Sequence, residues 1–143
     1  MKNNMNMTQE DKKLLLKDLC ARLPYGVKVY NEFYRWTACP KGVVGDRCYF
    51  NDNPRYDGDC TVEEVKPYLR PMSSMTDEER KEYESFIFTQ HHEWDGHGTS
   101  TNYVETDDVE RYVTWLNKNM FDYRGLIEKG LAIEAPENMY NLA

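Results

Sequence analysis

The sequence has few histidines and cysteines, the residues that most often bind zinc. Its 143 residues include three histidines, all within the segment HHEWDGHG at 91–98, and four cysteines without a C-x-x-C pair. Closely spaced thiolates that would hold a zinc ion are therefore not indicated. The sequence also has no Gly-rich phosphate loop and no G-x-S-x-G. It carries no motif typical of nucleotide binding or serine hydrolysis.

Long apolar runs are missing as well. None approaches the roughly 18 residues that a transmembrane helix needs, and the start, MKNNMNMTQE, lacks the apolar region of a secretory signal. We therefore expect a cytoplasmic protein without a membrane partner, whose initiator is Met1 or Met7. A composition of 40% hydrophobic and 13% aromatic residues is too rich in large side chains for a disordered chain.

The cysteines, Cys20, Cys39, Cys48 and Cys60, are irregularly spaced. In a cytoplasmic chain we interpret them as reduced thiols that serve as small apolar fillers. Convergence of the last three remains an alternative, which requires their strands to be neighbours.

Acidic residues are concentrated in one half of the chain. The net charge is -7, but residues 1–71 hold 12 Lys and Arg against 10 Asp and Glu, whereas residues 72–143 hold 6 against 15. A phosphate backbone is bound by clustered Lys and Arg, so this balance disfavours nucleic acid. It favours a protein partner with a basic surface, or else a simple solvated acidic face.

The first element is predicted from a cap and a helical repeat. Thr8 is placed as an N-cap, and an apolar face recurs until Pro24 ends the run. That face comprises Leu15, Leu16, Leu19, Cys20 and Leu23. The pattern predicts an N-terminal helix that must dock on another element, because an isolated helix of this length is marginal in water.

Residues 25–60 show a different pattern. The segments VKVY, EFYRWTA and VVGDRCYF are rich in β-branched and aromatic residues and are separated by turn-forming stretches. They predict three or four short antiparallel strands, closed into a small SH3-like or OB-like barrel with the helix plugging one end. Pro67 and Pro71 predict that the following segment, TVEEVKPYLRPMSSMT, forms no long regular element.

The second half is predicted to be helical. A capping box from Thr76 to Glu79 predicts a helix from Asp77 to about Thr89. A further helix is predicted after Thr106 from the spacing of Val109, Tyr112, Val113 and Leu116. The stretch FDYRGLIEKGLAIEAP predicts a short final helix, and Pro136 begins a tail.

The predicted fold class is thus α+β: an N-terminal helix plus a small antiparallel SH3-like or OB-like barrel, followed by a helical C-terminal half. We expect a disordered start at 1–7, a helix and barrel subdomain at 8–71, and a helical subdomain at 72–143 packed on it as one compact unit.

Three stretches, LLLKDLCARLPYGVKV, VEEVKPYLRPMSSMT and WLNKNMFDYRGLIEKGLAIEAPENMYN, resemble a family of short uncharacterised proteins of gut Bacteroidales and of their phages and prophages. The blocks cover about half of the chain. The resemblance implies an origin in a phage or mobile element, and it carries no activity and no catalytic residue. The histidine segment and residues 49–59 lie outside the matching blocks.

The histidine segment comes close to the zinc motif H-E-x-x-H, but His92 and His97 are offset by five residues. At about 100° per residue this offset turns the second side chain about 140° from the first. His91-x-Glu93 also matches part of the zinc deaminase signature, yet no P-C-x-x-C follows. A looser metal site of His91, Asp95 and His97 remains an alternative to a surface loop.

Aromatic residues are the better lead to a binding function. Alternation along a strand would put Tyr34 and Trp36 on one face and Phe33 on the other. Tyr34 and Trp36 are therefore candidate binding residues, either as an exposed platform or as filling of a small core.

A second candidate pair is Tyr123 and Arg124, the residue types enriched at binding hot spots. The structural alternative is an ion pair between Asp122 and Arg124 that holds a turn.

Together these features predict a small accessory protein of phage or mobile-element origin that binds a protein partner in the host cytoplasm without catalysis or cofactor. One alternative is a metal-dependent hydrolase or nuclease that uses His91, Asp95 and His97. Another is a nucleic-acid-binding barrel with a basic patch around exposed aromatics, built from Lys28, Arg35, Lys41 and Arg47. The oligomeric state is not predicted.

Overall fold

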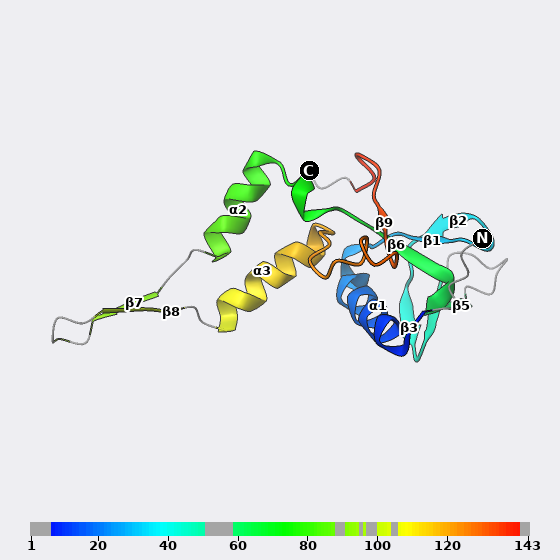
Figure 1. Ribbon diagram of the computed structural model, residues 1–143, viewed down its shortest axis with the longest axis horizontal. Helices are drawn as coiled ribbons and strands as arrows, with labels where there is room; N and C mark the ends of the chain where they lie inside the picture. The colour runs from blue at the N-terminus through cyan, green and yellow to red at the C-terminus, as the bar shows by residue number, and fades with distance from the viewer. Residues whose placement is uncertain are drawn as a thin grey trace.

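The computed structural model describes residues 7–50, 59–87, 91–94, 96, 100–103 and 106–140 (Figure 1). The helices are α1 (Gln9–Arg22), α2 (Asp77–Ile87) and α3 (Thr106–Lys118), with short 3-10 turns at Leu23–Tyr25, Val62–Glu64 and Met72–Ser74. The strands are β1 (Val29–Asn31), β2 (Trp36–Ala38), β3 (Gly42–Val44), β4 (Arg47–Tyr49), β5 (Asp59–Thr61), β6 (Val65–Leu69), β7 (His91–Trp94), β8 (Ser100–Tyr103) and β9 (Ile133–Glu134). The α+β class and the N-terminal helix are confirmed. In the described ranges no helix is both long and apolar enough to cross a membrane.

Helix α1 begins where its cap predicts. The Thr8 side-chain oxygen accepts a hydrogen bond of 3.0 Å from the backbone N–H of Asp11, which satisfies one of the exposed donors of the first turn. Leu15 and Leu19 are completely buried. The buried face also contains Asp18 and Arg22, which the apolar repeat did not indicate.

The predicted barrel is not found among the described strands. These strands form three separate sheets, with the orders β2-β1-β6-β9, β3-β4-β5 and β7-β8. The chain leaves β2 through Cys39 and the buried Pro40, and β3 then starts a second sheet instead of extending the first. A proline restricts the residue before it and donates no hydrogen bond, so the ladder is interrupted there.

Pro67 lies inside a central strand, β6, which at five residues is compatible with the expectation that no long regular element forms here. Strand β6 pairs with β1 on one side and with β9 on the other. The N–H of Tyr68 donates to the carbonyl oxygen of Lys28 at 2.8 Å, so the nitrogen of Pro67 faces the opposite side. Pairing with β9 starts one residue later, at Tyr68, and the missing donor therefore breaks no ladder hydrogen bond.

Helices α2 and α3 pack against each other, and β7 and β8 extend beyond their far ends, away from the other sheets (Figure 1). The capping box is confirmed, since Thr76 N–H donates to Glu79 Oε1 at 3.0 Å and Glu79 N–H donates to Thr76 Oγ1 at 3.1 Å. The histidine segment, expected as a loop, contributes strand β7, which pairs antiparallel with β8 from His91–Tyr103 to Trp94–Ser100.

The short helix expected over residues 121–136 is wrong. This segment forms successive turns and then β9. Gly125 and Gly130 have φ values of 72° and 76°, in the left-handed region that interrupts a right-handed helix. Strand β9 then runs parallel to β6, which brings the end of the chain back to its first half.

Two groups of buried side chains stabilise the fold. The first combines α1 and both larger sheets with the segment Met120–Ala132. The second lies between α2 and α3, where Tyr83 and Trp115 stack at a centroid distance of 5.9 Å and Trp115 and Phe121 stack at 5.5 Å. Phe121 stands at the end of the helical pair and precedes the turns that enter the first group.

Candidate binding site

The turn between β1 and β2 presents two large aromatic side chains to solvent. Phe33 is 53% exposed and Tyr34 is 62% exposed. Both lie in the four-residue turn 32–35, which we call the aromatic turn. Adjacent exposed aromatics of this size offer large apolar contact area with few rotatable bonds. They are suited to insertion into a pocket of another macromolecule.

The aromatic turn is held in place by a buried asparagine. Asn31 is completely buried, and its Oδ1 accepts hydrogen bonds from the N–H groups of Phe33 at 2.9 Å and Tyr34 at 3.0 Å. The N–H of Arg35 donates to the Asn31 carbonyl at 2.8 Å, and Arg35 has φ 55°. This Asx-type turn fixes the backbone beneath both rings, so little conformational entropy remains to be lost there on binding.

The structure separates the two residues that alternation predicted to share a face. Tyr34 lies in a turn, where strand alternation does not apply, whereas Trp36 begins β2 and is half-buried. The Trp36 ring packs edge-on against Phe50 at a centroid distance of 4.9 Å. Trp36 therefore supports the core, and Phe33, which sequence reasoning placed on the opposite face, joins Tyr34. Asn31 lies at the end of β1, two residues before Phe33, and an asparagine at this place was the signal that could have identified the turn.

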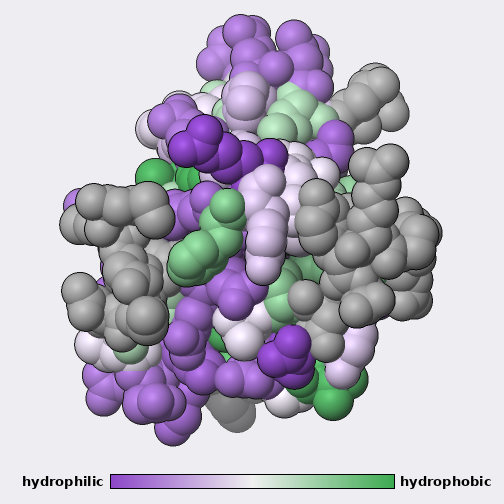
Figure 2. Space-filling model, turned by 90° about the vertical axis from the view of Figure 1, so that its right-hand side faces the viewer, coloured by the Kyte–Doolittle hydropathy of each residue, from purple (hydrophilic) through white to green (hydrophobic). Residues whose placement is uncertain are grey.

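The face of the molecule that carries the sheets mixes hydrophilic and hydrophobic side chains (Figure 2). Its described residues form no single broad hydrophobic area in this view. A contact made there would depend on local anchors with a polar surround, which is the usual composition of a non-obligate interface.

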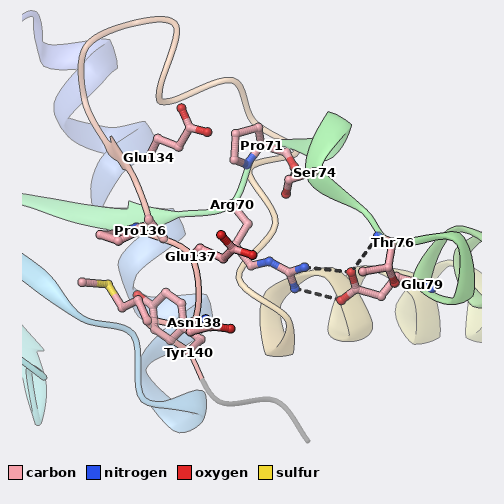
Figure 3. A pocket seen from close by; sticks show the side chains of 12 residues that line it. Arg70, Pro71, Ser74, Thr76, Glu79, Glu134, Pro136, Glu137, Asn138 and Tyr140 are labelled. Atoms are coloured by element: carbon pink, nitrogen blue, oxygen red, sulfur yellow. Dashed lines mark hydrogen bonds and ion pairs between the residues drawn. The ribbon is translucent and has the colours of Figure 1, made fainter.

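A second feature is a groove of about 610 Å³ between the start of α2 and the C-terminal segment (Figure 3). Arg70 lies on its floor and binds Glu79 through two hydrogen bonds, of 2.9 Å from Nη1 and 2.7 Å from Nη2. Arg70 Nη1 also donates to the Asn119 carbonyl at 3.2 Å, and its guanidinium lies 4.2 Å from the centroid of the Phe121 ring. Arg70 thus joins β6 to α2 and to the end of α3.

The groove favours a cationic group. The Arg70 hydrogen bonds hold the pKa of Glu79 below its ordinary value, against the opposing effect of partial burial. Two further carboxylates, of Glu134 and Glu137, line the groove and are exposed. Since Arg70 is already paired, the remaining charge of the lining is negative, and an anion would be repelled.

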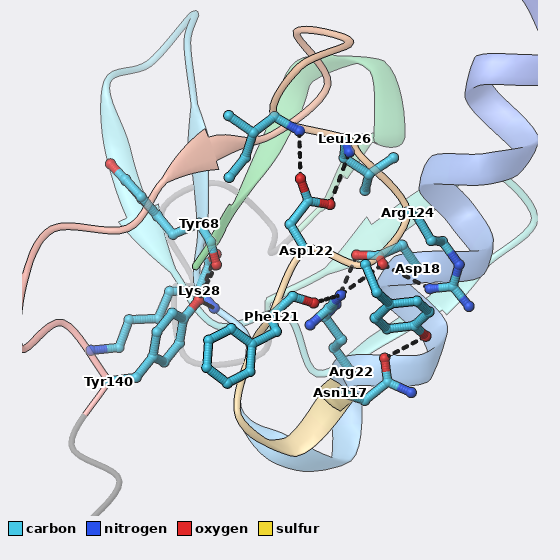
Figure 4. A network of polar contacts seen from close by, with 12 residues as sticks. Asp18, Arg22, Lys28, Tyr68, Asn117, Phe121, Asp122, Arg124, Leu126 and Tyr140 are labelled. Atoms are coloured by element: carbon cyan, nitrogen blue, oxygen red, sulfur yellow. Dashed lines mark hydrogen bonds and ion pairs between the residues drawn. The ribbon is translucent and has the colours of Figure 1, made fainter. Parts of the chain in front are cut away.

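Tyr123 and Arg124 are half-buried members of a polar network, in which Figure 4 labels Arg124 with its partner Asp18. The Tyr123 hydroxyl donates to Asn117 Oδ1 at 2.8 Å, and the guanidinium of Arg124 lies 4.6 Å from the Tyr123 ring centroid. Arg124 Nη1 donates to Asp18 Oδ1 at 2.7 Å. Both side chains are half-buried, so their role here is to hold the network.

The centre of this network is the buried ion pair of Asp18 and Arg22. Arg22 Nε donates to Asp18 Oδ2 at 2.9 Å, and Arg22 Nη2 donates to Asp18 Oδ1 at 3.1 Å and to the Phe121 carbonyl at 2.6 Å. Arg22 Nη1 has no hydrogen-bond partner within the described part of the chain. The Asp18 carboxylate accepts hydrogen bonds from two arginines, so its loss would leave both guanidinium groups without this acceptor.

The ion pair proposed between Asp122 and Arg124 is not formed. The Asp122 carboxylate accepts hydrogen bonds from the N–H groups of Leu126 at 2.8 Å and Ile127 at 2.9 Å, and it thereby holds the following turn. Arg124 instead pairs with Asp18, 106 residues away. Local sequence could not indicate that distant partner.

The structure does not test the candidate metal site. His91 begins β7, and Asp95 and His97 lie outside the described residues. Across the ranges that the structure describes, no group of three or more His, Cys, Asp or Glu side chains could hold a metal ion.

The basic patch of the nucleic-acid alternative loses one of its members. The Lys28 ammonium donates to the Met139 carbonyl at 3.1 Å and lies 5.8 Å from the Tyr140 ring centroid. Lys28 precedes β1, at the end of the hairpin opposite the aromatic turn. Near that turn, Lys66 is paired with Glu32 at 2.9 Å. Lys28 is therefore directed away from Phe33 and Tyr34, whereas Arg35 belongs to the aromatic turn itself.

No protein-family model, curated protein or solved structure matches this chain.

Proposed function

We propose that this protein is a non-catalytic accessory protein that binds a protein partner through the aromatic turn. The observation that carries the proposal is the exposure of Phe33 and Tyr34, both more than half accessible, on a backbone held by the buried Asn31. More than half of each ring remains in contact with water, and a partner pocket would bury that remaining apolar area.

The charge of the chain supports a protein over a nucleic acid as the partner. The net charge is -7, Lys28 is bound to the Met139 carbonyl, and the charge of Lys66 near the turn is paired with that of Glu32. A nucleic acid would have to approach against this charge. The resemblance of about half of the sequence to short proteins of Bacteroidales and their phages supports an origin in a phage or mobile element, with the cytoplasm of the bacterial host as the place of action.

The test is site-specific photocrosslinking in the bacterial cytoplasm. A photoreactive phenylalanine analogue is introduced in place of Phe33, of Tyr34, or of Val44, and the cross-linked products are identified by mass spectrometry. Val44 is the matched control, since it is 66% exposed at the end of β3 and belongs to a different sheet. We expect one shared partner from positions 33 and 34 that is absent from position 44.

The affinity for that partner supplies the second measurement. Phe33→Ser and Tyr34→Ser should each weaken binding by about 30-fold, as expected for a hot-spot side chain worth about 2 kcal/mol, while Val44→Ser leaves it unchanged. Thermal unfolding of each variant serves as the folding control, and the exposed sites should show little change. Equal cross-linking from all three positions, or none from 33 and 34, would contradict the proposal.

A further inference from the structure

Two cysteines that are separated along the chain face each other across adjacent strands. Cys48 on β4 and Cys60 on β5 are direct partners in the antiparallel register. Both are present as thiols, and both are buried, with exposures of 0% and 5%. Directly opposed residues of an antiparallel pair extend their side chains from the same face of the sheet. The two sulfur atoms are therefore held on one side of the β3-β4-β5 sheet.

The position of the two cysteines in the ladder, hydrogen-bonded or not, decides whether they can form a disulfide. Val62 N–H donates to the Asp46 carbonyl at 2.7 Å, two residues along the same ladder, so Cys48 and Cys60 also occupy a hydrogen-bonded position. Opposed Cα atoms at such a position are about 5.5 Å apart, which lies within the range of about 4.4–6.8 Å that disulfides span. Opposed Cβ atoms are about 4.5–5.5 Å apart, whereas a disulfide holds them about 3.5–4.5 Å apart, so the two strands must approach each other by about 1 Å for the bond to close.

We propose that Cys48 and Cys60 form a redox-active cross-strand thiol pair that closes to a disulfide when the protein meets a peroxide. Among the described side chains, no group of three or more His, Cys, Asp or Glu residues that could hold a metal ion includes the pair. The other cysteines lie elsewhere: Cys20 is exposed on α1, and the Cys39 thiol donates to the Gly26 carbonyl at 3.8 Å.

The reaction balances with hydrogen peroxide as the oxidant. Cys60 lies on β5, the edge strand of its sheet, and it is the more accessible of the two. The Cys60 sulfur gives up its proton and attacks one peroxide oxygen, which breaks the O–O bond and makes a sulfenic acid, and the departing oxygen takes up the proton and leaves as water. Cys48 sulfur then attacks the Cys60 sulfur, forms the S–S bond and releases the second water. Two thiols are oxidised, and one peroxide is reduced to two waters.

The new bond would tie an edge strand to the centre of its sheet. β5 continues through the turn Val62–Glu64 into β6, and Glu63 in that turn binds Lys12 of α1 at 2.9 Å. Cross-linking β4 to β5 also closes the segment 48–60 into a loop, which restricts the unfolded chain. The oxidised protein should therefore resist unfolding better than the reduced protein, and a dithiol reductant should reverse the change.

The experiment uses the full chain with Cys20→Ser and Cys39→Ser, which leaves Cys48 and Cys60 as the only cysteines. After treatment with equimolar peroxide, intact mass spectrometry should show the loss of two hydrogens, and peptide mapping should link Cys48 to Cys60. No thiol should then be alkylated in denaturant, and the midpoint of thermal unfolding should rise by about 5–10 °C. Dithiothreitol should restore both thiols and the original midpoint.

Adding Cys48→Ala to the same background is the matched control, and it should gain oxygen instead of losing hydrogen. The mass and alkylation readouts do not depend on whether this control folds, because they are made on the parent protein. Two alkylatable thiols after oxidation, a gain of oxygen without a cross-link, or a bond between two chains would each overturn the proposal.

Discussion

The hydroxyl of Tyr140 donates a hydrogen bond of 2.7 Å to the carbonyl oxygen of Tyr68 (Figure 4). The same hydroxyl accepts a hydrogen bond of 2.9 Å from the backbone N–H of Lys28. The hydroxyl therefore bridges the Lys28 N–H and the Tyr68 carbonyl, at the place where a direct backbone hydrogen bond would otherwise end the β1-β6 ladder. Burial raises the pKa of Tyr140 far above its usual range, so the hydroxyl keeps its proton even in alkaline solution. One side chain from the last described residue thus completes the central sheet.

Replacing this residue by phenylalanine should destabilise the protein while keeping the ring. Tyr140→Phe leaves the Lys28 N–H and the Tyr68 carbonyl without their partner, which should lower the free energy of unfolding by about 1–3 kcal/mol. Urea denaturation followed by circular dichroism measures the loss. Tyr25→Phe is the control, because Tyr25 is 39% exposed. Equal stability of both variants would show that the hydroxyl bridge is not formed.

Removing the buried carboxylate of α1 should be far more damaging than removing a surface one. Asp18 is completely buried and accepts hydrogen bonds from Arg22 and Arg124. Asp18→Ala leaves these charges uncompensated and should cost about 3–5 kcal/mol of stability. Glu32→Ala, which breaks the partly exposed pair with Lys66, should cost about 0–1 kcal/mol. Chemical denaturation compares the two, and Asp18→Asn is measured as well if the alanine variant does not fold. A small loss for Asp18→Ala would contradict the network.

The pairing of Arg70 with Glu79 predicts a pH dependence at the start of α2. A carboxyl whose pKa is lower in the folded state contributes stability above its ordinary value of 4.5 and loses that contribution as pH falls through the lowered folded value. The stability difference between wild type and Glu79→Gln should therefore shrink as pH is reduced from about 6 to about 3. Urea titrations across this range measure it, with the exposed neighbour Glu78→Gln as control. A difference that stays constant with pH would refute the effect.

Metal analysis separates the binding function from the hydrolase alternative. We expect the purified, untagged protein to contain far less than one zinc, iron or manganese ion per chain by elemental mass spectrometry. An affinity tag must be absent because its histidines would bind metal. A stoichiometric metal that disappears in His97→Ala would instead support a site of His91, Asp95 and His97.

Local signals in the sequence predicted the helices well. The Thr8 cap, the Thr76–Glu79 capping box and the apolar repeat that ends at Leu116 each depend on residues within a few positions of one another. Such signals act through backbone hydrogen bonds inside one or two turns, so they operate wherever the segment lies in the fold.

The sheets were predicted less well, for a physical reason. A strand of three residues has too little pattern to choose its partner, and pairing depends on where the rest of the chain brings other edges. Pro67 illustrates this, since it is compatible with a central strand at the one position where its missing donor faces no partner. The helix predicted over the final segment was wrong because Gly125 and Gly130 take left-handed φ values, and the low helix propensity of glycine was the local signal against a helix there.

For the candidate site, the sequence identified Tyr34 but paired it with the wrong neighbour. The side-chain hydrogen bonds of Asn31 turn the chain beneath Phe33 and Tyr34, and this local geometry overrides strand alternation. Tyr123 and Arg124 are also residues of the hot-spot type, yet their half-buried side chains are held by hydrogen bonds to Asn117 and Asp18.

By itself the sequence determined the α+β class, the starts of the three helices and the acidic balance of the second half, because caps, periodicity and charge are properties of neighbouring residues. Tertiary structure alone decided that Asp18 meets Arg124, that Tyr140 bridges Lys28 and Tyr68, and that Cys48 faces Cys60. Each of these contacts depends on sheet register or on docking between distant segments, and the free energy that selects them comes from burial of the whole core.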